Sequence, residues 1–551
     1  MLPLVPNLML GPLLRYVGET DAVIWVETDA PCEVEVLGTR ERTFQVCGHH
    51  YALVCCAGLR PGTWHEYEVR LDGERGWPAL EGFPPSAFHT YPKDTPLEVV
   101  FGSCRVAAPH EPPYSLRKDD DERGREIDSL RTLAQRMRDE PRERWPDVLA
   151  MIGDQVYADE VPPRTRSFID SRRDASEPPG ERVVDFEEYT RLYHESWGEP
   201  TIRWLLSTLS TAMIFDDHDV HDDWNISQAW LDEMRSHQWW NEHIVAALAS
   251  YWIYQHIGNL EPGHHADDEL LRKVKDADDG WPLLAEFARA ADESTSGTRW
   301  SYCRNLGRTR LVVIDSRAGR VLEEGKRSML DDEEWDWVAE HFAGDFDHLL
   351  VATSLPWLLA PGMHYAEAWS EALAAGAWGG AIAPLGERLR QTGDLEHWAA
   401  FQESFARLTE LLRSVAAGER GRAPSSVVVL SGDVHHAYLC EVAFRRDAGV
   451  RSHVFQAVCS PYRNPLEARE RRIIRLGTTR GLELVTRALA AAAGVAEPDV
   501  RWRMVGDGPW FDNQLGTLRI DGRAIELRLE KAVPVDETSA RLERVLARTL
   551  A

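Results

Sequence analysis

The chain lacks the features that place a protein in a membrane, in a disulfide scaffold or on a nucleic acid. Its 551 residues contain no run of roughly 18 or more uncharged apolar residues, so no membrane span is predicted. The eight cysteines show neither a CxxC pair nor zinc-finger spacing, which argues against a disulfide framework. Basic residues are outnumbered, 62 to 90 by acidic ones, and the formal net charge of -28 argues against broad nucleic-acid binding.

The N-terminal segment also lacks the signals of an exported protein. It is apolar, but it has no basic n-region, no twin arginine and no small-residue cleavage site. We therefore predict a reduced, cytoplasmic protein. What the chain does have is 43% hydrophobic and 28% charged residues, a balance typical of a folded enzyme with a sizeable core. Its length predicts more than one domain, or one large core with an appendage.

Two patterns divide the chain. Residues 1–92 contain short alternating strands and tight turns, which predict a fibronectin- or immunoglobulin-like β-sandwich. From residue 93 to 551, buried strands alternate with longer helical segments, which predicts an α/β layered core. The strands are expected at 97–101, 148–152, 212–215, 311–314, 349–352, 427–430 and 454–458. Within about 466–551 we expect a β-hairpin around Asp521-Gly522 and, from Asp536, a terminal packing helix.

Polar side chains follow five of these strands. The segments are Gly102-Ser103-Cys104-Arg105, Gly153-Asp154-Gln155-Val156-Tyr157-Ala158-Asp159, Asp216-Asp217-His218-Asp219-Val220-His221-Asp222-Asp223-Trp224, Asp315-Ser316-Arg317 and Ser431-Gly432-Asp433-Val434-His435-His436. In an open α/β sheet, ligands bind beyond the carboxyl ends of the strands. One aspartate at a strand end means little, but packing does not explain five such ends. Clustered carboxylates repel one another unless cations neutralise them, so the sequence predicts a metal centre.

The types of ligand constrain the ions. Carboxylates favour hard cations such as Ca²⁺, Mg²⁺ and Mn²⁺. A thiolate, a phenolate and an imidazole suit a softer or higher-valent ion such as Zn²⁺ or Fe³⁺. The mixture indicates two unlike metals that share a carboxylate. Two metals about 3.5–4 Å apart can clamp both oxygens of an in-line displacement at phosphorus.

This series of motifs resembles the PhoD-type alkaline phosphatase/phosphodiesterase family and is more distantly similar to the purple acid phosphatases and calcineurin-like metallophosphoesterases. The most specific pieces are Asp-Asp-His at 216–218 and Gly-Asp-Val-His-His at 432–436. The resemblance covers roughly residues 10–465. It implies a four-layer αββα metallophosphoesterase core behind the small β module.

The resemblance also assigns roles to individual residues. Asp154 would bridge both metals. The ferric ion would be held by Cys104, Tyr157 and His435, and the second ion, calcium, by Asp217 and Asp433. His218 would stand near the leaving group as a general acid or phosphate donor. The ions would lower the pKa of a bound water to about 7, so that a metal-activated hydroxide attacks phosphorus.

Three further residues are candidates for contact with the substrate. Arg105 follows the cysteine directly, and a guanidinium matches phosphate oxygens bidentately. Arg317 is either a second phosphate contact or a salt-bridge partner of a nearby acid. His436, beside a predicted ligand, either touches substrate or supports the ligands.

The chain departs from the family pattern after the strand at 349–352. Family members often carry an amide there, and this chain has Thr353-Ser354. The second metal then loses a ligand or takes a hydroxyl or a water instead. That leaves its identity open, with Mn²⁺, Mg²⁺ or Zn²⁺ as alternatives to Ca²⁺.

We therefore expect metal-dependent hydrolysis of small-molecule phosphoric esters, of phosphodiesterase or alkaline phosphatase type. A diester preference is favoured because no second basic cluster follows the motifs to hold a dianionic monoester. The alternative is a catalytically decayed scaffolding or binding protein with a fibronectin-like module. Decay should delete ligands, yet all seven ligand and acid residues named by the resemblance are present.

Overall fold

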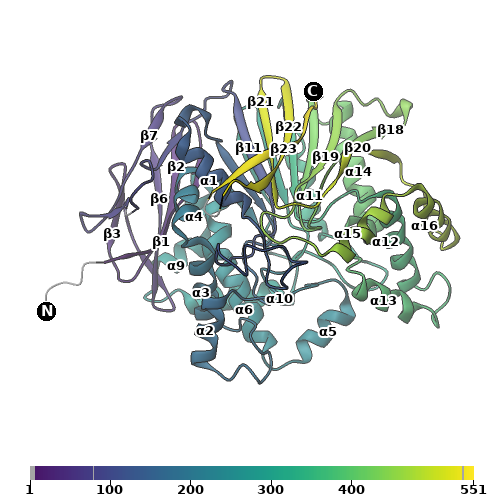
Figure 1. Ribbon diagram of the computed structural model, residues 1–551, viewed down its shortest axis with the longest axis horizontal. Coiled ribbons are helices and arrows are strands. Elements are labelled where there is room, and N and C mark those ends of the chain that lie inside the picture. Colours follow the sequence, from purple (N-terminus) through teal and green to yellow (C-terminus); the bar gives the residue numbers. More distant parts are fainter. Residues whose placement is uncertain (1–5, 79, 537–538) are drawn as a thin grey trace.

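The first strands form the β-sandwich expected from the sequence, at the left of Figure 1. The computed structural model describes residues 6–78, 80–536 and 539–551. One sheet has the order β1 (Leu8–Val17), β2 (Asp21–Thr28), β6 (His49–Ala57) and β5 (Phe44–Val46). The other has the order β4 (Thr39–Arg42), β3 (Glu33–Val36), β8 (Val69–Leu71) and β9 (Glu74–Trp77). A two-stranded sheet of β10 (Ala87–His89) and β7 (Trp64–Glu66) adjoins them.

Two large mixed sheets build the core. The six-stranded sheet has the order β13 (Ser210–Ile214), β12 (Val148–Ile152), β11 (Leu97–Gly102), β21 (Gln514–Asp521), β22 (Ala524–Pro534) and β23 (Ala540–Thr549). The seven-stranded sheet has the order β14 (Tyr302–Leu306), β15 (Thr309–Ile314), β16 (His348–Thr353), β17 (Ser426–Ser431), β19 (His453–Val458), β18 (Ala437–Phe444) and β20 (Val500–Trp510). Strands β11 to β13 are parallel, as are β15, β16, β17 and β19. Their carboxyl ends therefore gather the segments that follow them.

Helices cover the outer faces of both sheets, so the core has the expected αββα layers (Figure 1). Helices α1 (Ser129–Asp139) and α4 (Pro200–Thr208) pack on the six-stranded sheet, and α11 (Asp332–His341) and α14 (Gln402–Ala417) on the seven-stranded one. Along β16, Leu349 and Val351 join the cluster under α11 and α14, while Leu350 and Ala352 join the core between the sheets. Both faces of the strand are buried, which explains why its sequence is apolar without alternation.

The remaining helices lie around the edges of the core. They are α2 (Pro163–Arg172), α3 (Phe186–Trp197), α5 (Gln228–Ser236), α6 (Trp240–Tyr251), α7 (Ile257–Asn259), α8 (Pro262–Asp267), α9 (Glu269–Asp276), α10 (Trp281–Glu293), α12 (Pro361–Ala374), α13 (Ala383–Thr392), α15 (Ala468–Gly477) and α16 (Arg480–Ala492). Helix α12 packs against α13, α15 and α16, at the end opposite the β-sandwich (Figure 1). Among the described residues, we find no helix with both the length and the apolarity needed to cross a membrane.

The expectation of a terminal helix is wrong. Residues 540–549 form β23, which pairs antiparallel with β22, while residues 537–538 lie outside the described part. Leu529 faces Leu546 and Glu530 faces Arg544, so Val545 is an extra residue in the ladder. Such a bulge breaks strict alternation, which is why the apolar spacing of this strand imitated a helix. The predicted hairpin is present as β21 and β22.

A buried polar cluster joins the β-sandwich to the core. Glu27 of β2 is 0% exposed. Its Oε1 lies 3.0 Å from His49 Nδ1, and its Oε2 accepts from Tyr254 Oη at 3.0 Å and lies 2.9 Å from His194 Nε2. His49 Nε2 is in turn 2.8 Å from Glu187 of α3. The sandwich is thereby fixed to α3 and to the segment after α6, and both carboxylate oxygens of Glu27 have partners.

Candidate metal centre

Cysteine, histidine and carboxylate side chains converge where β11, β12, β13 and β17 end. Ligand atoms lie within 4.8 Å of one another in the groups Cys104–Asp154–His435, Asp154–Asp217–His218, Asp216–Asp217–Asp433 and Asp159–His218–Asp222. The first group draws on both large sheets, because His435 follows β17 whereas Cys104 and Asp154 follow β11 and β12. Asp154 belongs to two groups, which is the arrangement a bridging carboxylate needs.

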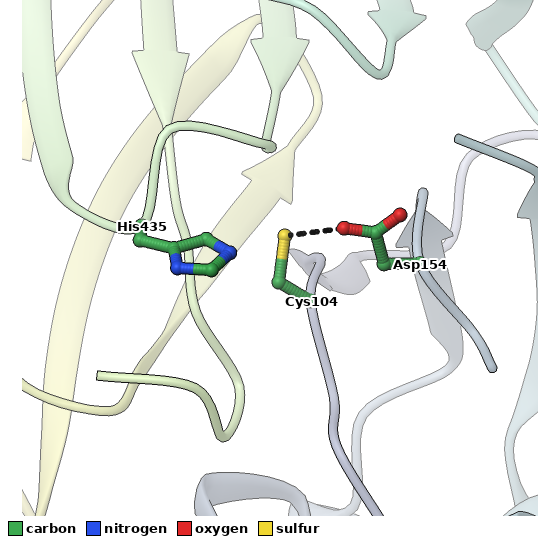
Figure 2. Close-up of side chains that lie close together, drawn as sticks. All are labelled: Cys104, Asp154 and His435. Carbon is green, nitrogen blue, oxygen red and sulfur yellow. Dashed lines mark hydrogen bonds between the residues drawn. The ribbon is translucent and has the colours of Figure 1, made fainter. Parts of the chain in front are cut away.

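The cysteine side of the centre is built around one oxygen of Asp154. Cys104 Sγ donates to Asp154 Oδ2 at 3.2 Å, and Tyr157 Oη donates to the same oxygen at 3.3 Å. Figure 2 shows the Cys104 sulfur between the imidazole of His435 and the carboxylate of Asp154. Asn464 Nδ2 donates to Tyr157 Oη at 3.2 Å and holds the phenol in place. The four ligands expected for the first ion are thus brought together.

The backbone that carries these ligands is strained. Cys104, Asp154, Asp433 and His435 have φ angles of 57°, 50°, 66° and 50°, a region that residues other than glycine seldom adopt. The two sheets also approach each other closely here, since a Cβ on Gly432 would stand 2.1 Å from Ser103 Oγ. Ser103 Oγ accepts from Asp433 N at 3.0 Å and lies 3.1 Å from Cys104 Sγ. Strain of this kind persists where the surrounding structure enforces it, and it is typical of functional sites.

The carboxylate side contains a buried arginine. Arg317 is 0% exposed and forms ion pairs with Asp216 and Glu396. Its Nη2 also stands 3.2 Å from Asp217 Oδ1 and 3.6 Å from Asp433 Oδ1. Arg317 was considered either as a phosphate contact or as a salt-bridge partner, and in the structure it forms salt bridges. One guanidinium offsets part of the charge of three aspartates.

Several carboxylate oxygens of the centre have no hydrogen-bond donor among the described residues. These buried atoms are Asp154 Oδ1, Asp216 Oδ2 and Asp217 Oδ1, although Arg317 lies beside the last at ion-pair distance. Burial raises the pKa of Asp154 well above its usual value, and the charges of Asp217 and Asp216 raise it further against the opposing effect of His218. Buried polar atoms are normally paired, so unpaired oxygens in a charged cluster fit a cation. The donor set suits the predicted metals.

His218 stands at the edge of the cluster with one nitrogen held. Its Nδ1 lies 2.9 Å from Asp159 Oδ1, and its ring stacks on Tyr157 at a centroid distance of 4.5 Å. Burial alone would lower the pKa of His218, but Asp159 and Asp217 raise it well above the usual value. Its side chain keeps 18% exposure. The geometry leaves Nε2 on the side of Asp222, 3.8 Å away, so His218 can present a proton at that atom.

The predicted substrate contacts Arg105 and His436 are both buried. The guanidinium of Arg105 is buried: Nε and Nη2 pair with Asp128, and Nη1 donates to Ser196 O at 2.8 Å. We correct the expectation of a phosphate clamp, because Asp128, the N-cap of α1, already engages this side chain. His436 is also buried. Its Nδ1 donates to Val434 O at 2.6 Å and its ring lies against Tyr438 and Phe511.

Other residues of the centre were not assigned from the sequence. Asp159 and Asp216 lie within the strand-end segments, and that position was an available signal. His397 and Glu367 come from a loop and a helix far from the motifs. His397 Nε2 lies 3.0 Å from Asp433 Oδ2, and its Nδ1 lies 2.6 Å from Glu367 Oε1. No periodicity or motif in their segments pointed to them.

Comparison with known proteins agrees with this geometry. Residues 132–276 match the PhoD-like phosphatase family, and residues 5–88 match a domain of unknown function, DUF7800. No curated protein sequence matches the chain. A solved structure of PhoD superposes with a TM-score of 0.60 at 11% identity, covering 99% of this chain and 92% of that one. A purple acid phosphatase, PPD1 from yellow lupin (Lupinus luteus) seeds, gives 0.51 at 11% identity, covering 98% and 73%.

The solved structures share the fold, and the family match lies over the segment that supplies Asp154, Tyr157, Asp217 and His218. The reading of the chain as a decayed scaffold loses its ground, since the ligands are both present and assembled. Part of the chain, residues 132–276, is thus similar to the PhoD-like phosphatases, and the whole chain shares its fold with PhoD and with a purple acid phosphatase.

Proposed function

We propose that the protein hydrolyses small-molecule phosphoric diesters at a centre of two unlike metal ions. The observation that carries this proposal is the position of Asp154. It belongs both to the group with Cys104 and His435 and to the group with Asp217 and His218, and it keeps a buried oxygen without a donor. A carboxylate shared in this way is suited to bridge two cations.

The donor types assign the ions. Cys104, Tyr157 and His435, with Asp154, would hold Fe³⁺, and Asp217 and Asp433, with Asp154, would hold a divalent ion, Ca²⁺ by resemblance. When bound, such ions supply activation of a water for attack and neutralisation of the charge that develops at phosphorus.

The side chains of the protein supply the proton transfer. Asp159 fixes the His218 ring through Nδ1, and the neighbouring acids favour the protonated imidazole. We propose that His218 gives the proton at Nε2 to the leaving oxygen as general acid. A positioned acid of this kind contributes roughly 10²–10⁴-fold.

The state of the arginines favours diesters. Both guanidiniums nominated as phosphate contacts, Arg105 and Arg317, are buried in ion pairs with Asp128 and with Asp216 and Glu396. A monoester carries a second negative charge that would call for an additional cation. We therefore expect bis-p-nitrophenyl phosphate to be a better substrate than p-nitrophenyl phosphate.

The test is hydrolysis of these two compounds by the metal-loaded protein and its variants. Asp154→Asn should lower kcat/KM by roughly 10²–10³-fold, the scale of losing a principal electrostatic contact. Asp347→Asn is the matched control, because Asp347 is a buried carboxylate at the opposite end of β16 that pairs with Arg308 and Arg422. Full activity in Asp154→Asn, or in metal-free wild type, would contradict the proposal.

A further inference from the structure

The carboxylate side of the centre lacks a donor at the end of β16. The family pattern suggests an amide there, and the chain carries Thr353 and Ser354. Both hydroxyls already have partners within the protein. Trp398 Nε1 donates to Thr353 Oγ1 at 3.2 Å, and Ser354 Oγ pairs with Ser316 Oγ at 2.8 Å. These bonds argue against either hydroxyl as the replacement ligand.

A histidine from a distant segment stands beside Asp433, one of the carboxylates expected to hold the second ion. His397 lies between α13 and Trp398, its side chain is 10% exposed, and its Nε2 is 3.0 Å from Asp433 Oδ2. Two adjacent donor atoms about 2.1 Å from one octahedrally coordinated ion are separated from each other by about 3 Å. The spacing between His397 and Asp433 is thus the spacing of two ligands on one ion.

A buried carboxylate supports the other side of the ring. His397 Nδ1 lies 2.6 Å from Oε1 of Glu367 on α12, a residue 1% exposed. Metal-binding histidines commonly donate their second N–H to a carboxylate, which fixes the tautomer and the orientation of the ring. When Nδ1–H of the neutral imidazole donates to Glu367, the lone pair of Nε2 faces Asp433. That contact is favourable only with a proton or a cation between the two atoms.

The loop that carries His397 is held on both sides. Glu396, the preceding residue, forms ion pairs with Arg317 and Arg320. Trp398, the following residue, is 0% exposed and bonds to Thr353 at the end of β16. The imidazole is therefore brought, by a different segment, to the strand end where the amide is missing.

We propose that His397, oriented by Glu367, is a ligand of the second ion and replaces the amide of the family pattern. This inference rests on the proposed two-ion function. It also changes the expected ion. Ca²⁺ takes oxygen ligands, whereas an imidazole suits Mn²⁺ or Zn²⁺, so the second position should prefer a divalent transition metal or zinc over calcium.

The experiment measures binding rather than turnover. The full-length protein is stripped of metal and loaded with its first ion, and Mn²⁺ is titrated by calorimetry, with metal content checked by elemental analysis. His397→Ala should weaken Mn²⁺ binding by roughly 10²-fold or more, and Glu367→Gln by roughly 10–100-fold as expected for a residue behind a ligand. His341→Ala is the control, because His341 lies on α11 and not in the segments of the metal centre. This variant should bind Mn²⁺ with the affinity of the wild type.

A second variant guards against loss of folding. His397→Asn keeps a polar side chain and restores an amide oxygen, so the preference should move from Mn²⁺ toward Ca²⁺. Two ions in wild type with unchanged Mn²⁺ affinity in both His397 variants would overturn the ligand assignment alone. A single ion per chain in wild type would instead overturn the two-ion function on which it rests.

Discussion

Glu27, between the β-sandwich and the core, and Asp154, at the metal centre, are both buried carboxylates, 0% and 1% exposed. Glu27 receives contacts from His49 and His194 and a hydroxyl donor from Tyr254. Burial alone would raise the pKa of Glu27, but His194 and His49 together lower it. Asp154 has only the weak donors Cys104 and Tyr157 on one oxygen, and its pKa is raised by burial.

The difference separates a structural carboxylate from a ligand. When the protein supplies partners for both oxygens of a buried carboxylate, that carboxylate needs no bound ion. One that keeps an unpaired oxygen among other acids carries an uncompensated cost, which a cation removes. Both residues are buried carboxylates, but Glu27 holds the β-sandwich to the core, whereas Asp154 is suited to bind an ion.

The largest expected effect is a loss of stability when metal is removed, which should involve the cluster around Asp154 and not the cluster around Glu27. Chelation should lower the free energy of unfolding of the wild type by about 4 kcal/mol, the stabilisation from an ion at roughly 1,000 times its Kd. Thermal melts with and without chelator measure this. Asp154→Asn should show little such difference, because its ligand set is already broken. Identical melts for loaded and chelated wild type would remove the distinction between the clusters.

A change at the other cluster should have the opposite signature. Glu27→Gln removes the charge from the contacts to His49 and His194 and should lower the free energy of unfolding by about 1.5–3 kcal/mol, the range for hydrogen bonds to a charged group. Activity and metal content should not change, since Glu27 is not at the metal centre. Glu74→Gln, on an exposed position of the same sandwich, is the control for denaturant unfolding. A loss of bound metal in Glu27→Gln would show that the two clusters are coupled.

The smallest effect is a dependence on pH. The pKa of His49 is raised to about 9: burial lowers it, but Glu187 and Glu27 outweigh burial. The pKa of His49 in the folded protein exceeds its value of about 6.5 in the unfolded chain. Its contribution to the free energy of unfolding is therefore complete below about pH 6.5 and disappears as the pH rises through about 9. We expect about 1 kcal/mol. Chelated protein should lose this stability between those limits, and His49→Gln should not.

The sequence was sufficient for the parts of the fold and site that depend on local pattern. The strands before Cys104, Asp154, Asp217 and Asp433 are apolar runs that end in polar residues, so both their positions and the gathering of their ends could be predicted. The strands are parallel, so their carboxyl ends meet at one edge of a sheet and bring these residues together.

What could not be predicted depends on tertiary contacts. The bulge at Val545 disguised β23 as a helix. Arg105 follows a ligand in the sequence, but Asp128 at the start of α1 engages its side chain. His397 meets Asp433, and Glu367 of α12 meets His397, because two ion pairs of Glu396 and the bond from Trp398 hold the loop of His397 at the end of β16. No spacing within a segment encodes contacts of this kind.

The order of strands in the six-stranded sheet has a consequence for synthesis of the chain. β11, which leads to Cys104, pairs with β12 on one side and with β21 on the other, and β21 begins only at Gln514. On the ribosome, one edge of β11 therefore stays uncovered until the more than 400 residues between β11 and β21 have been made. An uncovered edge recruits foreign strands, and partly made sheets are prone to aggregate. The six-stranded sheet, whose strand β11 leads to Cys104, is therefore completed late in synthesis.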